Sequence, residues 1–161
     1  LVLAGGSAGG HLATVAAASP GRFKAADLPT ELAKIDPAVA GLLALAAPTD
    51  LVALHRDSST GRDLLRAYLA CPARSSCSVT RLALASPLEH VSAAAPPALF
   101  VYGELDTLVP PTRHGDPIVA AWRAAGRRAD ELVVGGAGHN LDAQVLDQAF
   151  VDAFVDRVVR R

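Results

Sequence analysis

The sequence feature that most constrains the fold is a glycine-rich turn directly after the apolar run of residues 1–4. It reads Gly-Gly-Ser-Ala-Gly-Gly-His, which places Gly5, Ser7 and Gly9 in the pattern Gly-x-Ser-x-Gly. Between a strand and a helix, this pattern is typical of a nucleophile elbow, a strained turn that exposes the serine hydroxyl. We expect Gly5 and Gly9 to be required, because a Cβ at either position would collide with the neighbouring strand or helix. The turn therefore predicts a strand, an exposed Ser7 and a helix over residues 8–18.

Apolar runs punctuated by glycine and proline predict strands and helices in alternation along the whole chain. The expected strands cover residues 1–4, 41–46, 98–103 and 131–134. The expected helices cover residues 8–18, 60–69 and 116–125, with a turn of helix at 31–35 and a C-terminal helix whose apolar positions run from Val145 to Val158. Short, continuously apolar strands of this kind are typical of a mostly parallel sheet with helices on both faces. The predicted fold class is therefore α/β.

Composition excludes several classes of partner. The chain has 161 residues, which suits one domain, and a net charge of −1 at pH 7. A balance so close to neutral gives no electrostatic basis for binding nucleic acid or an anionic membrane. No apolar stretch approaches the roughly 20 residues that span a bilayer. We therefore expect no nucleic-acid partner and no membrane span, whereas the oligomeric state stays open.

The two cysteines, Cys71 and Cys77, lie six residues apart in a polar loop. They could close a surface disulfide, which would place the protein in an oxidising compartment such as the periplasm or the extracellular space. They could equally be two unrelated loop thiols of a cytoplasmic protein. A metal site is less favoured, because two thiols without a nearby histidine supply too few ligands.

A candidate base and a candidate acid follow two of the later strands. A serine nucleophile needs a base to take its proton, and the base needs a carboxylate to orient it. In an open parallel sheet such groups lie on loops beyond the C-terminal ends of the strands. Asp106 follows the third expected strand, with Glu104 as a rival acid, and His139 lies in the glycine-rich loop after the fourth. The order Ser7, Asp106, His139 is typical of α/β-hydrolases and of no other serine hydrolase fold.

Four segments resemble α/β-hydrolases, and within them the BD-FAE-like and hormone-sensitive-lipase-like esterases. These segments are residues 5–13, 85–88, 96–110 and 136–139. They keep the order and spacing of those families over nearly the whole chain. The resemblance implies that Ser7 is the nucleophile, Asp106 the acid and His139 the base. It also implies that the backbone N–H of Ala8 forms half of an oxyanion hole, whose other half is a His-Gly-Gly loop upstream of this sequence.

By this resemblance, residues 1–161 would be a single partial α/β-hydrolase domain without its N-terminal strands and oxyanion loop. The lack of methionine and a strand that begins at residue 1 agree with that expectation. The implied activity is that of a serine carboxylesterase, which cleaves short-chain acyl or carbohydrate-linked esters through an acyl-enzyme, with no metal or organic cofactor. Two alternatives stay open, a serine peptidase of the acyl-peptide or prolyl-oligopeptidase type and a truncated, inactive fragment. In the fragment the first strand would be an apolar edge that invites aggregation.

Several polar residues have weaker claims to a function. His11 occupies the position where a phosphate-binding P-loop requires lysine, so that motif is excluded. We expect His11 to be structural or to line the substrate pocket, rather than to act as a base. Asp50 could line the pocket, but a carboxylate that caps a loop is favoured. His55, His90 and His114 have no motif context and are expected at the surface.

Overall fold

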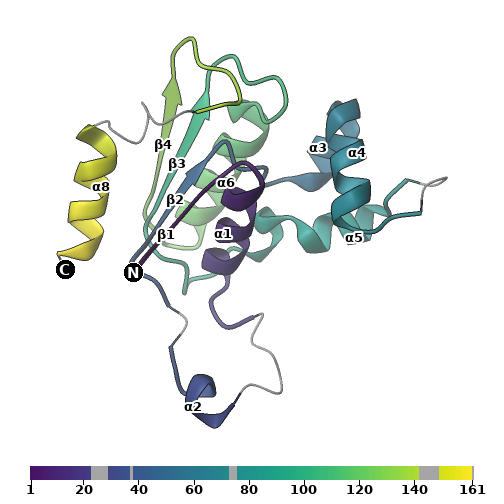
Figure 1. Cartoon of the computed structure of the whole chain (residues 1–161). Coiled ribbons are helices and arrows are strands. Elements are labelled where there is room, and N and C mark those ends of the chain that lie inside the picture. Colours follow the sequence, from purple (N-terminus) through teal and green to yellow (C-terminus); the bar gives the residue numbers. More distant parts are fainter. Residues whose placement is uncertain (23–28, 37, 73–75, 142–148, 161) are drawn as a thin grey trace.

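The computed structural model describes residues 1–22, 29–36, 38–72, 76–141 and 149–160, and its centre is a four-stranded sheet (Figure 1). The strands are β1 (Val2–Gly6), β2 (Gly41–Leu45), β3 (Ala98–Gly103) and β4 (Ala129–Val134). They lie in the order β1-β2-β3-β4, and each pairs in parallel with the next. The predicted parallel α/β sheet is confirmed, and all four C-terminal strand ends open onto one edge.

Helices cover both faces of this sheet, as predicted. Helices α1 (Ala8–Ala18) and α6 (Pro111–Ala124) pack on one face, and α8 (Ala149–Val159) packs on the other (Figure 1). Successive side chains of a strand point to opposite faces, so Phe100 and Tyr102 of β3 meet α6. Their neighbours Leu99 and Val101 meet α8 instead. Both faces of β2 and β3 are therefore buried, and the core lies in two layers around them.

A third group of helices lies between β2 and β3 in sequence, and its own small core is built around Leu51, Leu65 and Leu82. It comprises α3 (Leu51–Asp57), α4 (Ser59–Tyr68), α5 (Val79–Ala85) and the 3₁₀ helix η1 (Pro87–His90). Only α4 is predicted from the sequence. The other helices have at most seven residues, too few to show a clear apolar period.

A disulfide joins Cys71 and Cys77 across the loop between α4 and α5, with Cα atoms 5.3 Å apart. Of the two interpretations of these cysteines, the structure thus supports the disulfide and not two unrelated thiols. Cys77 is buried in the same core as Leu65, so the disulfide attaches the C-terminal end of α4 to that core.

Strand β1 is the edge of the described sheet, because it pairs with β2 on one side only. Its residues are half-buried or exposed, whereas every residue of β2 is buried. Leu1, just before the strand, is 87% exposed. The apolar edge expected from the sequence is thus present in the described part of the chain.

Two predicted helix boundaries differ from the structure. Helix α6 begins at Pro111, five residues before the predicted start at residue 116, because proline is well accommodated in the first turn of a helix. Helix α8 begins at Ala149, and the predicted helical positions Val145 and Leu146 lie outside the described residues. The turn of helix expected at 31–35 is α2 (Thr30–Ala33).

Candidate active site

The turn between β1 and α1 holds Ser7 in a strained conformation. Its φ of 49° and ψ of −117° lie where L-residues are rarely found. The backbone N–H of Ser7 donates to the carbonyl of Leu45 at 2.8 Å, and its carbonyl accepts from the N–H of His11 at 2.9 Å. The turn is therefore fixed to β2 on one side and to the start of α1 on the other, as a nucleophile elbow requires.

The glycines around Ser7 do not all have the role that the pattern suggests. A Cβ on Gly5 would lie 2.5 Å from the backbone of Gly9, so the prediction for Gly5 is confirmed. The prediction for Gly9 is wrong, because a Cβ there meets nothing within 4 Å. The helix turns Gly9 toward solvent and Gly10 toward the strand, where a Cβ would lie 2.9 Å from the carbonyl oxygen of Gly5. Gly5 and Gly10 thus permit the close approach of strand and helix.

A chain of hydrogen bonds connects Ser7, His139 and Asp106. Ser7 Oγ lies 2.9 Å from His139 Nε2, and His139 Nδ1 lies 2.8 Å from Asp106 Oδ2. The second Asp106 oxygen, Oδ1, accepts the N–H groups of Leu108 and Val109 at 2.9 and 2.8 Å. The Asp106 side chain is completely buried, and that of His139 is 23% exposed. Since the carboxylate accepts Nδ1–H, Nε2 is the imidazole nitrogen free to accept the serine proton.

Glu104, the rival acid, has a different position. Its Oε2 accepts the N–H of Gly136 at 2.9 Å and is exposed. A second hydrogen bond connects the loop after β3 with the loop after β4, where the N–H of Leu105 donates to the carbonyl of Ala137 at 2.8 Å. Glu104 therefore braces the loop that carries His139, whereas Asp106 is the carboxylate that contacts the imidazole.

Ala8 is the first residue of α1 and directly follows Ser7. The first N–H groups of a helix have no acceptor within the helix, and they lie at the positive end of its dipole. Ala8 is exposed, so an oxyanion that forms next to Ser7 can reach its N–H. Ala8 thus lies at the helix position expected of an oxyanion donor, and that role stays a prediction.

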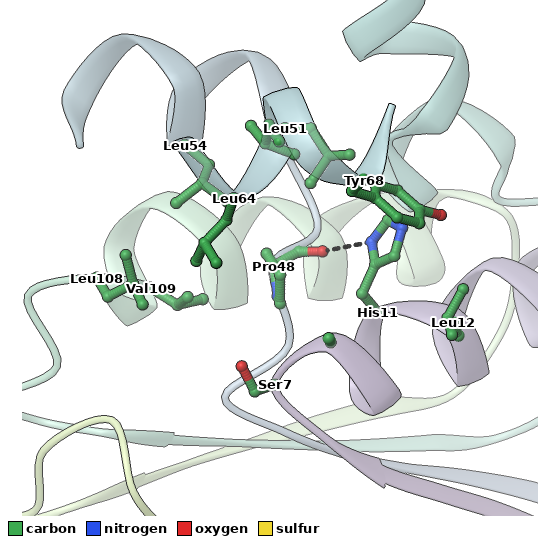
Figure 2. Close-up of a pocket in the computed structure, with 12 residues that line it drawn as sticks. Ser7, His11, Leu12, Pro48, Leu51, Leu54, Leu64, Tyr68, Leu108 and Val109 are labelled. Carbon is green, nitrogen blue, oxygen red and sulfur yellow. Dashed lines mark hydrogen bonds between the residues drawn. The ribbon is translucent and has the colours of Figure 1, made fainter. Parts of the chain in front are cut away.

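An apolar cavity of about 260 Å³ opens beside Ser7, between α1, α3 and α4 (Figure 2). Figure 2 shows Ser7 at its base with the hydroxyl directed toward Leu64. The aliphatic side chains that line it include Leu12, Leu51, Leu54, Leu64, Leu108 and Val109. A second cavity, of about 290 Å³, lies on the side of Ser7 where His139 and Asn140 are found. Ser7 lines both cavities.

His11 lines the apolar cavity, one of the two roles expected of it. Its Nδ1 donates to the carbonyl of Pro48 at 3.0 Å, and its ring meets Tyr68 edge-on at 5.5 Å (Figure 2). Burial lowers the pKa of His11, so the ring is neutral near pH 7. Asp50 is not among the residues that line the cavity. It caps α3 by accepting the N–H of Ala53 at 2.9 Å, which is the favoured prediction.

The prediction that the remaining histidines lie at the surface is wrong for two of them. His114 is 1% exposed, and its Nδ1 accepts the N–H groups of Thr49 and Asp50 at 3.3 Å. Burial lowers the pKa of His114 to about 4, so it is neutral and fixes the loop after β2. His90 is also buried, with Nε2 2.6 Å from the carbonyl oxygen of Leu84. His55 is half-buried.

The described residues contain no cluster of histidine, cysteine, aspartate and glutamate that could hold a metal ion. Within the same part of the chain, no helix is both long and apolar enough to cross a bilayer.

Solved structures with this fold include several esterases. A truncated carbohydrate esterase from gut microbiota is 22% identical, with a TM-score of 0.72 over 96% of this chain and 58% of its own. The propionate-bound esterase Est2 of the planctomycete Thermogutta terrifontis is 23% identical, with a TM-score of 0.68 over 98% of this chain and 56% of its own. An acylaminoacyl peptidase is 12% identical, with a TM-score of 0.72 over 99% of this chain and 24% of its own. The chain thus spans little more than half the length of these two esterases, and the likeness establishes a shared fold.

No curated protein is similar to this chain in sequence. The sequence profile of the BD-FAE family, however, matches residues 1–116, more than two thirds of the chain. The matched segment contains the turn at Ser7, strands β1 to β3 and the loop that holds Asp106. On this match, and on the α/β-hydrolase fold that accompanies it, the chain belongs to the BD-FAE family.

Proposed function

We propose that this chain carries the catalytic triad of a serine esterase, with Ser7 as nucleophile, His139 as general base and Asp106 as the carboxylate that orients it. The observation that carries the proposal is the hydrogen-bonded chain from Ser7 Oγ through His139 to the buried Asp106. Membership of the BD-FAE family supports it. The esterases among the solved structures with this fold support it further.

In the proposed reaction, His139 Nε2 takes the Ser7 proton while Oγ attacks the carbonyl carbon of an ester. Asp106 holds the Nδ1–H tautomer and stabilises the imidazolium that forms. The N–H of Ala8 stabilises the tetrahedral oxyanion, and His139 then gives its proton to the departing alcohol. A water molecule activated by His139 attacks the acyl-enzyme and releases the carboxylic acid.

We infer the substrate class from esterases that share this fold, because the geometry of the site alone does not define it. One of the esterases with this fold is a carbohydrate esterase, and another was solved with propionate bound. We therefore propose short-chain acyl esters and carbohydrate-linked esters as substrates of the complete protein. The acylaminoacyl peptidase shares the fold as well, which makes an acyl-peptide the alternative substrate.

Replacing the nucleophile tests the proposal. In the complete polypeptide that contains residues 1–161, Ser7→Ala should abolish hydrolysis of p-nitrophenyl acetate, while the exposed Ser59→Ala serves as the matched control. Retained turnover in Ser7→Ala would refute the assignment of the nucleophile. Faster cleavage of N-acetylalanine p-nitroanilide than of the ester by the wild type would favour the peptidase.

The disulfide leads us to propose that the protein matures in an oxidising compartment. Intact-mass analysis of the native protein tests this directly. Alkylation under denaturing conditions should label Cys71 and Cys77 only after reduction. Labelling of both thiols without a reductant would contradict the proposal.

A further inference from the structure

The two cavities beside Ser7 differ in their chemistry. The first is walled mostly by aliphatic side chains and contains Ala8, whose N–H is the proposed oxyanion donor. The second is lined by the polar side chains of His139 and Asn140 together with Gly6, Leu45, Ala46 and Leu141. His139 is absent from the lining of the first cavity. When the carbonyl carbon of an ester is bonded to Ser7, its acyl group and its alcohol group therefore occupy one cavity each.

The position of the proton decides which arm enters which cavity. The departing alcohol takes its proton from His139 Nε2, which lies 2.9 Å from Ser7 Oγ. The alcohol oxygen must lie within hydrogen-bond reach of that nitrogen, and so on the side of the second cavity. The acyl group of the ester then occupies the apolar cavity. This step rests on the proposed function, because it assumes that His139 is the general acid.

We propose that the apolar cavity is the acyl site, and that Leu64 and Tyr68 of α4 set the length of the acyl chain that it accepts. Leu64 faces Ser7 across the cavity, and Tyr68 lies over His11 at the far end (Figure 2). The two residues are four apart in a helix, so their side chains lie on one face, one turn apart. Both are about half exposed, at 55% and 52%, whereas Leu51 and Leu65 belong to the core.

The size of the cavity indicates the chain length. A methylene group occupies roughly the 30 Å³ that a water molecule takes in the liquid, so about 260 Å³ has room for an acyl chain of about six to eight carbon atoms. Each methylene buried in an apolar site contributes about fourfold to binding. We expect kcat/KM to rise from acetyl through butanoyl to hexanoyl esters, and to fall for chains longer than the cavity.

The test uses the complete polypeptide and two series of esters. In the first the alcohol is always p-nitrophenol, and the acyl chain grows from two to ten carbon atoms. In the second the acyl group is always acetyl, and the alkyl alcohol grows over the same range. Leu64→Trp fills part of the cavity, and we expect it to lower the ratio of kcat/KM for the hexanoyl ester to that for the acetyl ester about 15-fold, the effect of two lost methylene contacts.

A second variant and a control complete the test. Tyr68→Ala removes the side chain at the far end, and should move the preferred acyl chain to a length about two carbons greater. Leu84→Trp makes the same change as Leu64→Trp at an exposed residue of α5 that does not line the cavity, and should leave both series unchanged. Circular dichroism verifies that all three variants fold.

The outcomes separate this inference from the proposed function. A weaker dependence on acyl length in Leu64→Trp, with the alcohol series unaffected, supports the acyl site. An equal loss for acetyl and hexanoyl esters, or an effect confined to the alcohol series, overturns it even though ester hydrolysis persists. A wild type that hydrolyses neither series overturns the proposed function, and the acyl site with it.

Discussion

The carboxylate of Asp106 offers the sharpest single perturbation of the proposed triad. Asp106→Asn keeps the shape of a side chain that is completely buried. The amide oxygen can still accept the N–H groups of Leu108 and Val109, at 2.9 and 2.8 Å in the structure. The amide nitrogen then faces His139 Nδ1 and donates to it. This arrangement forces the imidazole proton onto Nε2, which can no longer accept the proton of Ser7.

The expected magnitude follows from this change of tautomer. Comparable substitutions in serine hydrolases lower kcat by roughly 10⁴-fold, which corresponds to about 5 kcal/mol of transition-state stabilisation. We expect kcat of Asp106→Asn to fall by about that factor, and KM to change little because Asp106 does not touch substrate. The free energy of unfolding should change by less than about 1 kcal/mol, since every backbone donor keeps an acceptor.

The assay is p-nitrophenyl acetate hydrolysis under saturating substrate, with Glu104→Gln as the matched control. Both variants remove a carboxylate from the same loop, but Glu104 contacts Gly136 and not His139. We expect Glu104→Gln to retain kcat within about fivefold of the wild type, because its effect is limited to one exposed hydrogen bond. A kcat of Asp106→Asn within tenfold of the wild type, or a larger loss in Glu104→Gln, would refute the assignment of the acid.

The remaining predictions concern stability. Gly10→Ala should lower the free energy of unfolding by about 2 kcal/mol, because its Cβ would meet the carbonyl oxygen of Gly5. Gly9→Ala should raise it by about 0.5 kcal/mol, because Gly9 is exposed in the same helix and alanine favours helix. Urea unfolding of both variants tests the difference. Burial, with nearby Asp116, raises the pKa of Glu131 to about 7, so the folded state loses stability as pH rises from about 4.5 through 7. Glu131→Gln should therefore unfold with a free energy about 1 kcal/mol higher than the wild type at pH 8, a value reduced because the Glu131 side chain is partly exposed. At pH 4 the two proteins should be equally stable. Thermal melts at the two pH values test this, and an equal difference at both would count against it. Replacing both cysteines by serine should cost about 2 kcal/mol for a closed loop of this size, and an unchanged melting temperature would contradict it.

The strands and the candidate site were accessible from the sequence for local reasons. β2 and β3 are continuous apolar runs bounded by glycine or proline, so their positions follow from the chain alone. Asp106 and His139 were identifiable because parallel strands bring their following loops to one edge. The geometry of their hydrogen bonds could not be predicted, since it depends on the conformation of two loops and on contacts such as that of Glu104 with Gly136.

The wrong predictions have physical causes beyond the local sequence. The motif does not specify which side of α1 faces the sheet, so it could not show that Gly10, and not Gly9, meets the strand. The burial of His114 depends on backbone donors at Thr49 and Asp50, more than 60 residues away in the chain. Likewise, the apolar cavity is formed by α3 and α4 folding over the elbow, a tertiary arrangement that no short pattern records.

The most direct test of the central claim is covalent labelling of the nucleophile. The complete polypeptide, treated with an alkyl fluorophosphonate and digested, should carry one adduct on the peptide that contains Ser7, with loss of esterase activity in the same proportion. His139→Ala should abolish labelling, because the serine then lacks its base. An adduct on another residue that accompanies the loss of activity, or full inactivation with Ser7 unmodified, would contradict the account.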